Sequence, residues 1–181
     1  PKSAEIIRPI LRGRDIKRYS FSYADLWLIA TFPSKHYNID DYPAIKEHLL
    51  SFGIERLEQT GKTHSICGET VKARKKTTNK WFETQDSISY WDDFSKQKII
   101  YPETTQGAYF ILDNGEFYLD KTCFFMISEY PHYLIATLSS KLFEYAYKHI
   151  FSSIELGASA YQYNKHAFVL LPVIEPSKVD G

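Results

Sequence analysis

Residues 98–127, KIIYPETTQGAYFILDNGEFYLDKTCFFMI, contain three runs with the composition of β-strands. The runs KIIYP, GAYFILDNGEFYL and KTCFFMI are rich in β-branched and aromatic residues, which suit a pleated and partly buried surface. Asp113, Asn114 and Gly115 interrupt the second run with the residue types that a tight hairpin turn requires. This stretch therefore predicts an antiparallel sheet.

Helical patterns lie on both sides of these strands. Residues 40–60 place a proline near the first turn and apolar residues at helical spacing, which predicts a helix that is bent near Gly53. Residues 131–150 show the same spacing on both sides of Ser139, which predicts one long helix or two consecutive helices. Residues 25–31, DLWLIAT, predict a buried strand. We expect an α+β fold with an antiparallel or mixed sheet of roughly five to seven strands, these flanking helices and a long basic loop.

Length and composition predict a single folded domain over residues 1–181. The chain is 44% apolar and 16% aromatic, which is enough for a core. No apolar run approaches the ~18 residues of a membrane span, and Cys67 and Cys123 are too few for a zinc cluster or a disulfide framework. We expect an intracellular, cytoplasmic protein without a membrane segment. Residue 1 is Pro and the only methionine is Met126, so we expect a piece of a longer protein.

The segment RPILRGRDIKRY, residues 8–19, concentrates positive charge. The whole chain carries 22 Lys plus Arg and 22 Asp plus Glu, so this excess is a property of the segment and not of the composition. Gly13 predicts a bend, and an ion pair between Arg14 and Asp15 that stabilises the bend is an alternative role for these charges. The cations of the segment are Arg8, Arg12, Arg14, Lys17 and Arg18, and its one acid is Asp15.

A second basic segment, KTHSICGETVKARKKTTNK at residues 62–80, has almost no large apolar residues. Such a segment cannot bury itself, so we expect a long exposed loop or a loose hairpin. Its one acid is Glu69, and its cations are Lys62, Lys72, Arg74, Lys75, Lys76 and Lys80.

Two cationic segments in a neutral chain favour a polyanionic partner. Positive side chains neutralise phosphates, while hydroxyl and amide groups bind phosphates and base edges, and residues of these types accompany the cations in both segments. A solvated surface is the alternative for any single lysine. The two segments together predict nucleic-acid binding.

No enzyme signature in the sequence is complete. The stretch TGKT at 60–63 resembles the end of a phosphate-binding loop, but Arg56 occupies the position of the required first glycine. Asp15 and Lys17, with Glu5, resemble part of a Mg²⁺-dependent nuclease site that lacks a second acid. The histidines have no ligand-like spacing. We expect no catalytic residue and no metal site in this chain.

Segments that cover nearly the whole chain resemble a known family. Their strongest pieces are the Arg-Gly-Arg-Asp-Ile opening with Tyr19, the element at 81–83 and the strand at 98–101. The order and spacing resemble the TaqI-like C-terminal specificity domain, the target-recognition domain of adenine-specific DNA methyltransferases and of type IIG enzymes. Those enzymes combine restriction and modification in one chain. The segments are IIRPILRGRDIKRY, LWLIAT, YPAIKEHLLSF, KWFE, KQKIIYP, a short strand hairpin, YLIATLSSKL and YQYNKHAFVLLPV.

The resemblance implies a prokaryotic source. It also implies that the chain holds a recognition sequence in double-stranded DNA while an upstream methyltransferase domain extrudes the target base. It also implies S-adenosylmethionine and Mg²⁺ in the parent protein, a nuclease domain in some parents, and no cofactor in this chain. The expected DNA-binding residues are Arg12, Arg14, Lys17, Arg18, Lys72, Arg74, Lys75, Lys76 and Lys80. Candidates for base or stacking contacts are Thr77, Thr78, Asn79, Tyr161 and Gln162. Gly13, Asp15 and Trp81 are expected to be structural.

Two other functions stay open on the residues alone. The chain has 14 Tyr, 12 Phe and 3 Trp, so an aromatic sheet face that docks another protein is one alternative. The small nuclease centred on Asp15 and Lys17 is the other. Trp81, Trp91 and Tyr101 are expected in the core rather than stacked on DNA.

Overall fold

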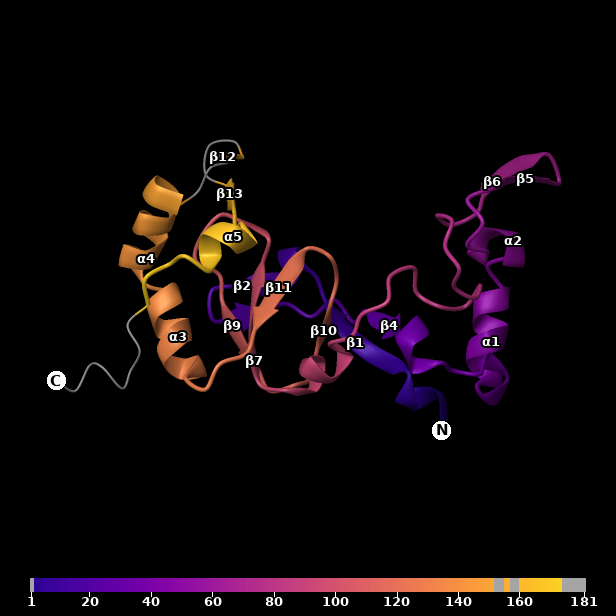
Figure 1. Cartoon of the computed structure of the whole chain (residues 1–181), viewed down its shortest axis with the longest axis horizontal. Helices are drawn as coiled ribbons and strands as arrows, with labels where there is room; N and C mark the ends of the chain where they lie inside the picture. Colours follow the sequence, from indigo (N-terminus) through magenta and orange to yellow (C-terminus); the bar gives the residue numbers. More distant parts are fainter. Residues whose placement is uncertain (1, 152–154, 157–159, 174–181) are drawn as a thin grey trace. The chain divides into compact units, whose positions relative to one another are not determined.

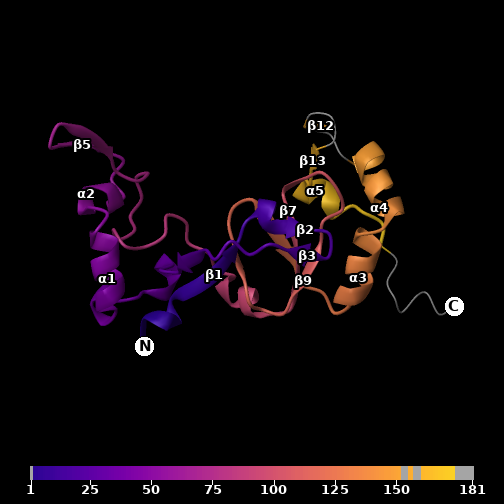
Figure 2. The same cartoon turned by 180° about the vertical axis from the view of Figure 1, so that it is seen from behind.

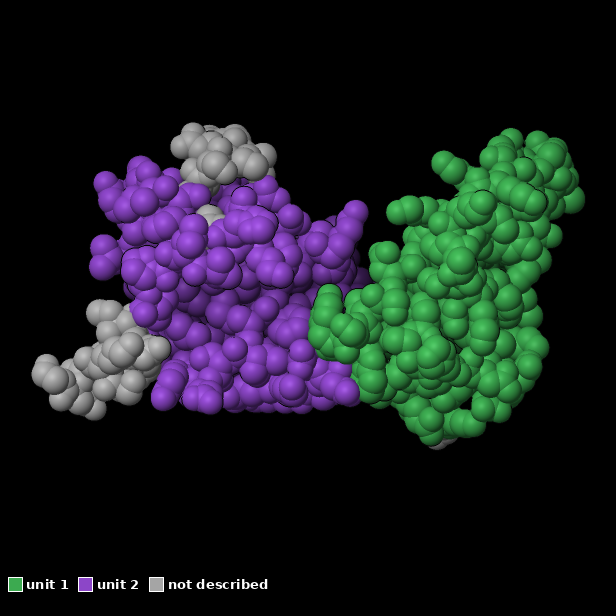
Figure 3. All heavy atoms as spheres, in the orientation of Figure 1, with its two compact units in different colours: residues 1–8, 27–91 green, residues 9–26, 92–181 purple. Residues whose placement is uncertain are grey.

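The computed structural model describes residues 2–151, 155–156 and 160–173. The chain divides into two compact units (Figure 3). Unit 1 comprises residues 1–8 and 27–91, and unit 2 comprises residues 9–26 and 92–181. The single domain expected over residues 1–181 stays a prediction.

Unit 2 contains most of the strands (Figures 1 and 2). Its strands are β2 (Ile16–Lys17), β3 (Ser20–Phe21), β7 (Lys98–Pro102), β8 (Thr104–Thr105), β9 (Ile111–Asp113), β10 (Tyr118–Leu119), β11 (Cys123–Met126), β12 (Glu155–Leu156) and β13 (Ala160–Gln162). Its helices are α3 (Pro131–Leu138), α4 (Lys141–Ala146), the π-helical turn η6 (Tyr147–Phe151) and α5 (Lys165–Phe168). A 3₁₀ turn, η2 (Gly13–Asp15), precedes β2.

Strand β7 is the centre of unit 2. It pairs with β11 and β9 in an antiparallel sheet of order β11-β7-β9, as the sequence of residues 98–127 predicts. Every residue of β7 is buried, because its two faces pack into different clusters. Ile99 and Tyr101 pack with residues of α3, α4 and η6, whereas Ile100 packs with Leu11 and residues near β2. A strand covered on both faces reads as a continuous apolar run, which explains the KIIYP pattern.

The N-terminal turn lies beside this sheet. The backbone N–H of Tyr19, between β2 and β3, donates to Phe110 O at 3.2 Å, and Figure 2 shows β2 and β3 beside β9. Ile16 of β2 is buried in the same cluster as Ile111 of β9. The short hairpin that follows the RGRD stretch is therefore held by the core of unit 2.

The predicted hairpin turn at Asp113–Gly115 differs from the structure. Gly115 has a positive φ of 94°, so the turn is present. The strands on its two sides do not pair, since β9 pairs with β7 and β10 pairs in parallel with β1 (Ile7–Leu11). The carboxylate of Asp113 accepts backbone N–H groups of residues 115–117 and the Nζ of buried Lys98, which fixes a wide loop in place of a tight hairpin.

The second helical region divides into α3 and α4, the two consecutive helices among the expected alternatives. The side chain of Ser140 accepts the Phe143 N–H at 3.1 Å and so caps α4. Strand β13 pairs with β8 and β12 in a further small sheet. The aromatic rings of Phe110, Tyr147 and Tyr163 are buried between these elements.

Unit 1 is built around a smaller core. Its elements are β4 (Trp27–Ile29), α1 (Pro43–Leu50), α2 (Ile54–Leu57), β5 (Thr63–Ile66), β6 (Glu69–Lys72) and the 3₁₀ turns Lys2–Glu5, Pro33–Lys35 and Ile39–Asp41; the turn Trp91–Ser95 follows. Ile6, Ile45 and Phe82 belong to its buried cluster. Gly53, with φ of 87°, separates α1 from α2, so the helix expected over 40–60 is broken and not merely bent.

The α+β class is confirmed, but the described strands form several two- and three-stranded sheets and not one sheet. Within residues 25–31, only Trp27–Ile29 form a strand, β4, which is a neighbour of β1, and Trp27 is 57% exposed. The strand expected there is thus present, and the prediction that it is buried is wrong. In the described part of the chain, no helix combines the length and apolarity that crossing a membrane requires.

Candidate nucleic-acid interface

The RGRD stretch folds as a turn closed by an ion pair between Arg12 and Asp15. Arg12 Nε donates to Asp15 Oδ2 at 2.9 Å and Arg12 Nη2 donates to Oδ1 at 2.8 Å. The Arg12 backbone N–H also donates to Oδ2, at 3.0 Å. The sequence alternative paired Asp15 with Arg14, but the bidentate partner is Arg12. The side-chain hydrogen bond from Arg12 holds the pKa of Asp15 below its ordinary value, although burial acts in the opposite direction.

Gly13 is required by close approach and not by its backbone angles. Its N–H donates to Thr122 Oγ1 at 2.8 Å. A Cβ at position 13 would lie 2.7 Å from the backbone oxygen of Thr122, which is closer than carbon and oxygen tolerate. The turn is therefore locked onto the segment that leads into β11.

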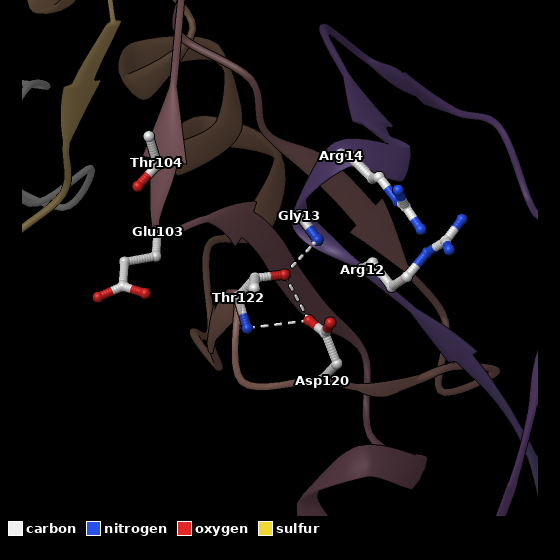
Figure 4. Close-up of a pocket in the computed structure, with 7 residues that line it drawn as sticks. All are labelled: Arg12, Gly13, Arg14, Glu103, Thr104, Asp120 and Thr122. Atoms are coloured by element: carbon white, nitrogen blue, oxygen red, sulfur yellow. Dashed lines mark hydrogen bonds between the residues drawn. The ribbon is translucent and has the colours of Figure 1, made fainter. Parts of the chain in front are cut away.

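A pocket of about 410 Å³ opens beside this turn (Figure 4). In Figure 4 the side chains of Arg12 and Arg14 extend to the side opposite Glu103. Asp120 Oδ1 accepts the N–H and the hydroxyl of Thr122, at 2.9 and 2.5 Å. The pocket thus contains both signs of charge. It is lined by Arg12, Gly13, Arg14, Glu103, Thr104, Asp120 and Thr122.

The other cations of this turn differ in their contacts. Arg18 Nη2 donates to Ser139 O at 2.7 Å, and its guanidinium lies 5.3 Å from the centre of the Tyr19 ring. Arg14 and Lys17 are exposed, and no hydrogen bond or ion pair to another described residue holds their side chains. Arg14 and Lys17 therefore remain available to an anion.

The second basic segment forms a hairpin followed by a hydrogen-bonded loop. Strands β5 and β6 pair antiparallel from Thr63↔Lys72 to Ile66↔Glu69. The loose hairpin was one of the two forms that the sequence predicts for this segment. In Figure 1 the hairpin extends beyond α2.

Arg74 lies inside the loop that follows β6. Its guanidinium donates to the backbone oxygens of Leu57 at 2.8 Å and Glu83 at 3.0 Å, and also to that of Trp81. Burial lowers the pKa of Arg74. Because three carbonyl groups converge on it, Arg74 joins α2 to the segment at 81–83 and has few donors left for a phosphate.

Thr77 and Asn79 are also bound within unit 1. Thr77 Oγ1 donates to Gln59 Oε1 at 2.7 Å, and Asn79 Nδ2 donates to the backbone oxygens of Thr84 and Gln85 at 3.0 and 2.9 Å. Thr78 is exposed. The loop thus has a frame of internal hydrogen bonds from which other side chains extend.

All five lysines of this segment face solvent. Lys62, Lys72, Lys75 and Lys76 have no hydrogen bond or ion pair to a described residue through their ammonium groups, and the ammonium of Lys80 lies 5.6 Å from the Phe82 ring centre. The segment thus contains one partly buried arginine and five exposed lysines. Exposed ammonium groups on a hydrogen-bonded frame are suited to contacts with phosphates.

A family model for the TaqI-like C-terminal specificity domain matches residues 8–173. The chain belongs to this family. Its domain type is that of DNA target recognition in restriction-modification enzymes, and this matches the resemblance drawn from the sequence. A comparison with curated proteins found no match.

In this specificity domain, the two residues of β13 that were expected to contact bases are Tyr161, which is buried, and Gln162, which is half-buried. Tyr161 is 2% exposed and its hydroxyl lies 3.2 Å from that of Tyr163. Gln162 Nε2 donates to Glu103 Oε1 at 2.8 Å. Tyr161 therefore presents almost no surface to a ligand, and the expectation that these residues contact bases stays a prediction.

Trp81 is half-buried in the specificity domain, and its ring meets that of Phe82 edge to face at 5.6 Å between centroids. Its backbone oxygen also accepts from Arg74. Tyr101 is buried. These contacts agree with the core positions expected for both rings.

The nuclease alternative gains no support from the specificity domain's geometry. Both carboxylate oxygens of Asp15 are bound by Arg12. Among residues 2–151, 155–156 and 160–173, no group of three or more His, Cys, Asp or Glu side chains could hold a metal ion. Asp15 is therefore placed as a component of the turn.

Two groups of residues in or beside the basic segments were not predicted from the sequence. Asp120 and Thr122 lie about a hundred positions from Gly13, so no local pattern points to them. The hydroxyl residues of the hairpin, Thr63, Ser65 and Thr70, had a local signal. They alternate with larger side chains on either side of Cys67–Gly68, and this alternation is typical of a two-residue hairpin.

Proposed function

We propose that this specificity domain recognises a particular double-stranded DNA sequence for an adenine-specific methyltransferase of a restriction-modification system. The separation of fixed from free cations is the observation that carries the proposal. Arg12, Arg18 and Arg74 donate to oxygen atoms of the chain, whereas several exposed cations of the two basic segments have no hydrogen-bond or ion-pair partner among the described residues. These free cations are Arg14, Lys17, Lys62, Lys72, Lys75 and Lys76.

This separation favours DNA for a physical reason. Ammonium and guanidinium groups that form no internal ion pair do not have to break one before they meet a phosphate, and each contact releases condensed counterions from the duplex. The hydrogen-bonded turn and loop keep the attachment points of these side chains ordered, which lowers the entropy lost on binding.

On this proposal the chemistry belongs to other domains. A methyltransferase domain, and a nuclease domain in a type IIG arrangement, would act on the site that this chain holds. S-adenosylmethionine would supply the methyl group there, and Mg²⁺ would support cleavage. Among the described residues, no group of three or more His, Cys, Asp or Glu side chains could hold a metal ion.

Selection from a pool of duplexes with a randomised central region tests sequence recognition. The 181-residue chain should enrich one sequence family, because base-edge contacts discriminate between base pairs by about 1–3 kcal/mol each. The affinity for the enriched duplex should then be measured by fluorescence anisotropy. If no sequence is enriched at any salt concentration, the proposal is wrong.

The salt dependence distinguishes DNA binding from the alternative of an aromatic protein-docking surface. Neutralisation of several phosphates should give a plot of log affinity against log salt with a slope of about −3 to −5, whereas an aromatic interface changes little. The double variant Lys75→Ala/Lys76→Ala should weaken binding to all duplexes and reduce this slope by about 2.

A matched control removes two lysines that are already ion-paired. Lys46 lies 2.6 Å from Asp40 and Lys96 lies 2.6 Å from Asp93. Lys46→Ala/Lys96→Ala makes the same change in net charge and should leave the slope nearly unchanged. Equal effects of the two double variants would show that net charge, and not the basic segment, determines binding.

The adenine methyltransferase part of the proposal has its own test. A complete protein that contains this chain, incubated with S-adenosylmethionine, should place N6-methyladenine inside the sequence enriched by the chain alone. Methylation of a different sequence, or of cytosine, would contradict this part and leave the DNA-recognition part standing.

A further inference from the structure

The β5–β6 hairpin has two chemically different faces. Cross-strand pairing places Thr63 opposite Lys72 and Ser65 opposite Thr70, and these four side chains share one face because alternate residues of a strand point the same way. All four are exposed. This outer face presents three hydroxyls and one ammonium group, and it has no acid and no large apolar side chain.

The opposite face anchors the hairpin. His64, Ile66 and Val71 are half-buried there, and β6 packs against α2. His64 Nε2 lies 3.7 Å from a carboxylate oxygen of Glu58, the residue that follows α2. This face accounts for the attachment of the hairpin to unit 1 and leaves the outer face without a packing role.

The base of the hairpin is held by backbone hydrogen bonds. The N–H of Ala73 donates to Lys62 O at 2.9 Å, the N–H of Gly61 donates to Arg74 O at 2.8 Å, and the N–H of Arg74 donates to Glu58 O at 2.9 Å. A two-stranded hairpin is marginal in water by itself. These bonds and the anchoring face therefore keep an extended ribbon ordered.

The turn at the tip is tight. Cys67 and Gly68 have φ values of 52° and 84°, and both positive angles are typical of the turn that continues the twist of a ribbon. The hairpin is consequently narrow up to its end, with Lys62, Lys75 and Lys76 exposed near its base.

We propose that this hairpin enters the major groove of duplex DNA and that Thr63, Ser65, Thr70 and Lys72 read base edges there. The inference deepens the proposed function and rests on it. The major groove admits a two-stranded ribbon, hydroxyl groups act as donors or acceptors to base edges, and lysine pairs with guanine O6 and N7. The lysines at the base then lie where the flanking phosphates pass.

The double variant Ser65→Ala/Thr70→Ala tests the reading role. The ratio of affinities for the enriched duplex and a scrambled duplex should fall about tenfold or more, because two base-edge partners are lost. The affinity for the scrambled duplex should stay within about twofold, since phosphate contacts are kept. Circular dichroism and the thermal midpoint should match those of the unmodified chain.

The matched control is Ser87→Ala/Ser89→Ala, which removes two exposed hydroxyls from the same unit outside the hairpin. The control should keep the full affinity ratio. If the hairpin variant also keeps it, the hairpin does not read bases although the domain still recognises DNA. A uniform loss for both duplexes would likewise overturn base reading, because it marks a phosphate contact. Absence of an enriched sequence for the unmodified chain would overturn the proposed function as well.

A cleavage probe attached to the tip of the hairpin tests independently where the hairpin lies on the DNA. Cys67 is exposed, whereas Cys123 is buried and burial raises the pKa of its thiol to about 12, so a thiol reagent should label Cys67 alone. An iron–EDTA group coupled to Cys67 should cut the duplex within the enriched sequence. Cleavage only outside that sequence, or none, would contradict the proposal, and Cys67→Ser provides the unlabelled control.

Discussion

Arg12 and Arg74 lie in the two basic segments, yet their guanidinium groups are bound to oxygen atoms of the chain itself. Each arginine has donors in a planar fork, so it can close a turn or bridge several carbonyls where lysine could bind only one or two. The lysines of the same segments are exposed. At the scale of single residues, Arg12 and Arg74 therefore have a different role from the lysines and from exposed Arg14 in the same stretches of positive charge.

The Arg12–Asp15 pair predicts a specific acid dependence. The pKa of Asp15 is lowered by its hydrogen bond with Arg12, so the folded chain keeps this carboxylate charged at pH values where the unfolded chain protonates it. The resulting stability is present above about pH 4 and is lost as the pH falls through the folded-state pKa.

Asp15→Asn should therefore lower the thermal midpoint at pH 7 by roughly 2–6 °C. The difference from the unmodified chain should shrink as the pH falls below about 4, because the unfolded chain then protonates Asp15 and the stability from the ion pair declines. Calorimetry across pH 3 to 7 measures this, with exposed Asp86→Asn as the control. A difference that stays constant down to pH 3 would show that the charge of Asp15 does not stabilise the fold.

At the scale of elements, two glycine turns differ in what surrounds them. Gly115, between β9 and β10, has φ of 94°, and a Cβ there would lie 2.3 Å from Ser95 O. Gly68, in the β5–β6 hairpin, has φ of 84°, but a Cβ there would meet nothing within 4 Å. Backbone strain is common to both positions, whereas steric overlap is confined to Gly115.

Gly115→Ala should reduce the free energy of unfolding by about 2–4 kcal/mol, because the strain of the positive φ is added to a clash with backbone. Gly68→Ala should reduce it by only about 1 kcal/mol or less, from strain alone. Urea unfolding followed by tryptophan fluorescence compares the two. A similar decrease in the free energy of unfolding for both variants would mean that the backbone near Ser95 shifts to relieve the clash at little energetic cost.

At the scale of the whole molecule, buried tyrosines make the fold sensitive to alkali. Burial raises the pKa of Tyr101 and of Tyr161 to about 12, and it also raises the pKa of Tyr163. The unfolded chain releases these protons near pH 10, so the folded chain holds more protons between pH 10 and 12 and its stability falls as the pH rises.

The unfolding transition should therefore occur above about pH 10 and should coincide with a cooperative increase in tyrosinate absorbance at 295 nm. Stopped-flow mixing to pH 12 compares the rate of the absorbance increase with the rate at which circular dichroism is lost. A single, immediate rise in absorbance would indicate that the buried hydroxyls are accessible without unfolding.

The sequence predicts those elements whose signal is local. Strands β7 and β11 are found at their expected places because their runs of β-branched and aromatic residues are visible in the sequence. The parallel partner of β10 was not predictable, since β1 is more than a hundred residues away. The turn predicted at Gly115 is present, because the residue types that form a turn are visible locally. The hairpin predicted around it is absent, because β9 pairs with β7 and β10 pairs with β1, which is distant in the sequence.

The candidate site shows the same division. Charge density in residues 8–19 and 62–80 is readable from the sequence, whereas the burial of Arg74 depends on carbonyl groups of Leu57, Trp81 and Glu83 that only folding brings together. The pairing of Asp15 with Arg12 rather than Arg14 depends on the geometry of a single turn. Local charge predicts where cations are, and the fold decides which of them remain free.

The outer face of the β5–β6 hairpin carries four exposed side chains. Residues there can vary over many types with little penalty to folding, because neither burial nor backbone angle restricts them. A library randomised at Thr63, Ser65, Thr70 and Lys72 should consequently yield mostly folded proteins. Substitutions on this face could therefore change which DNA sequence the domain recognises, in natural variants or in engineered ones, while the fold of unit 1 is kept.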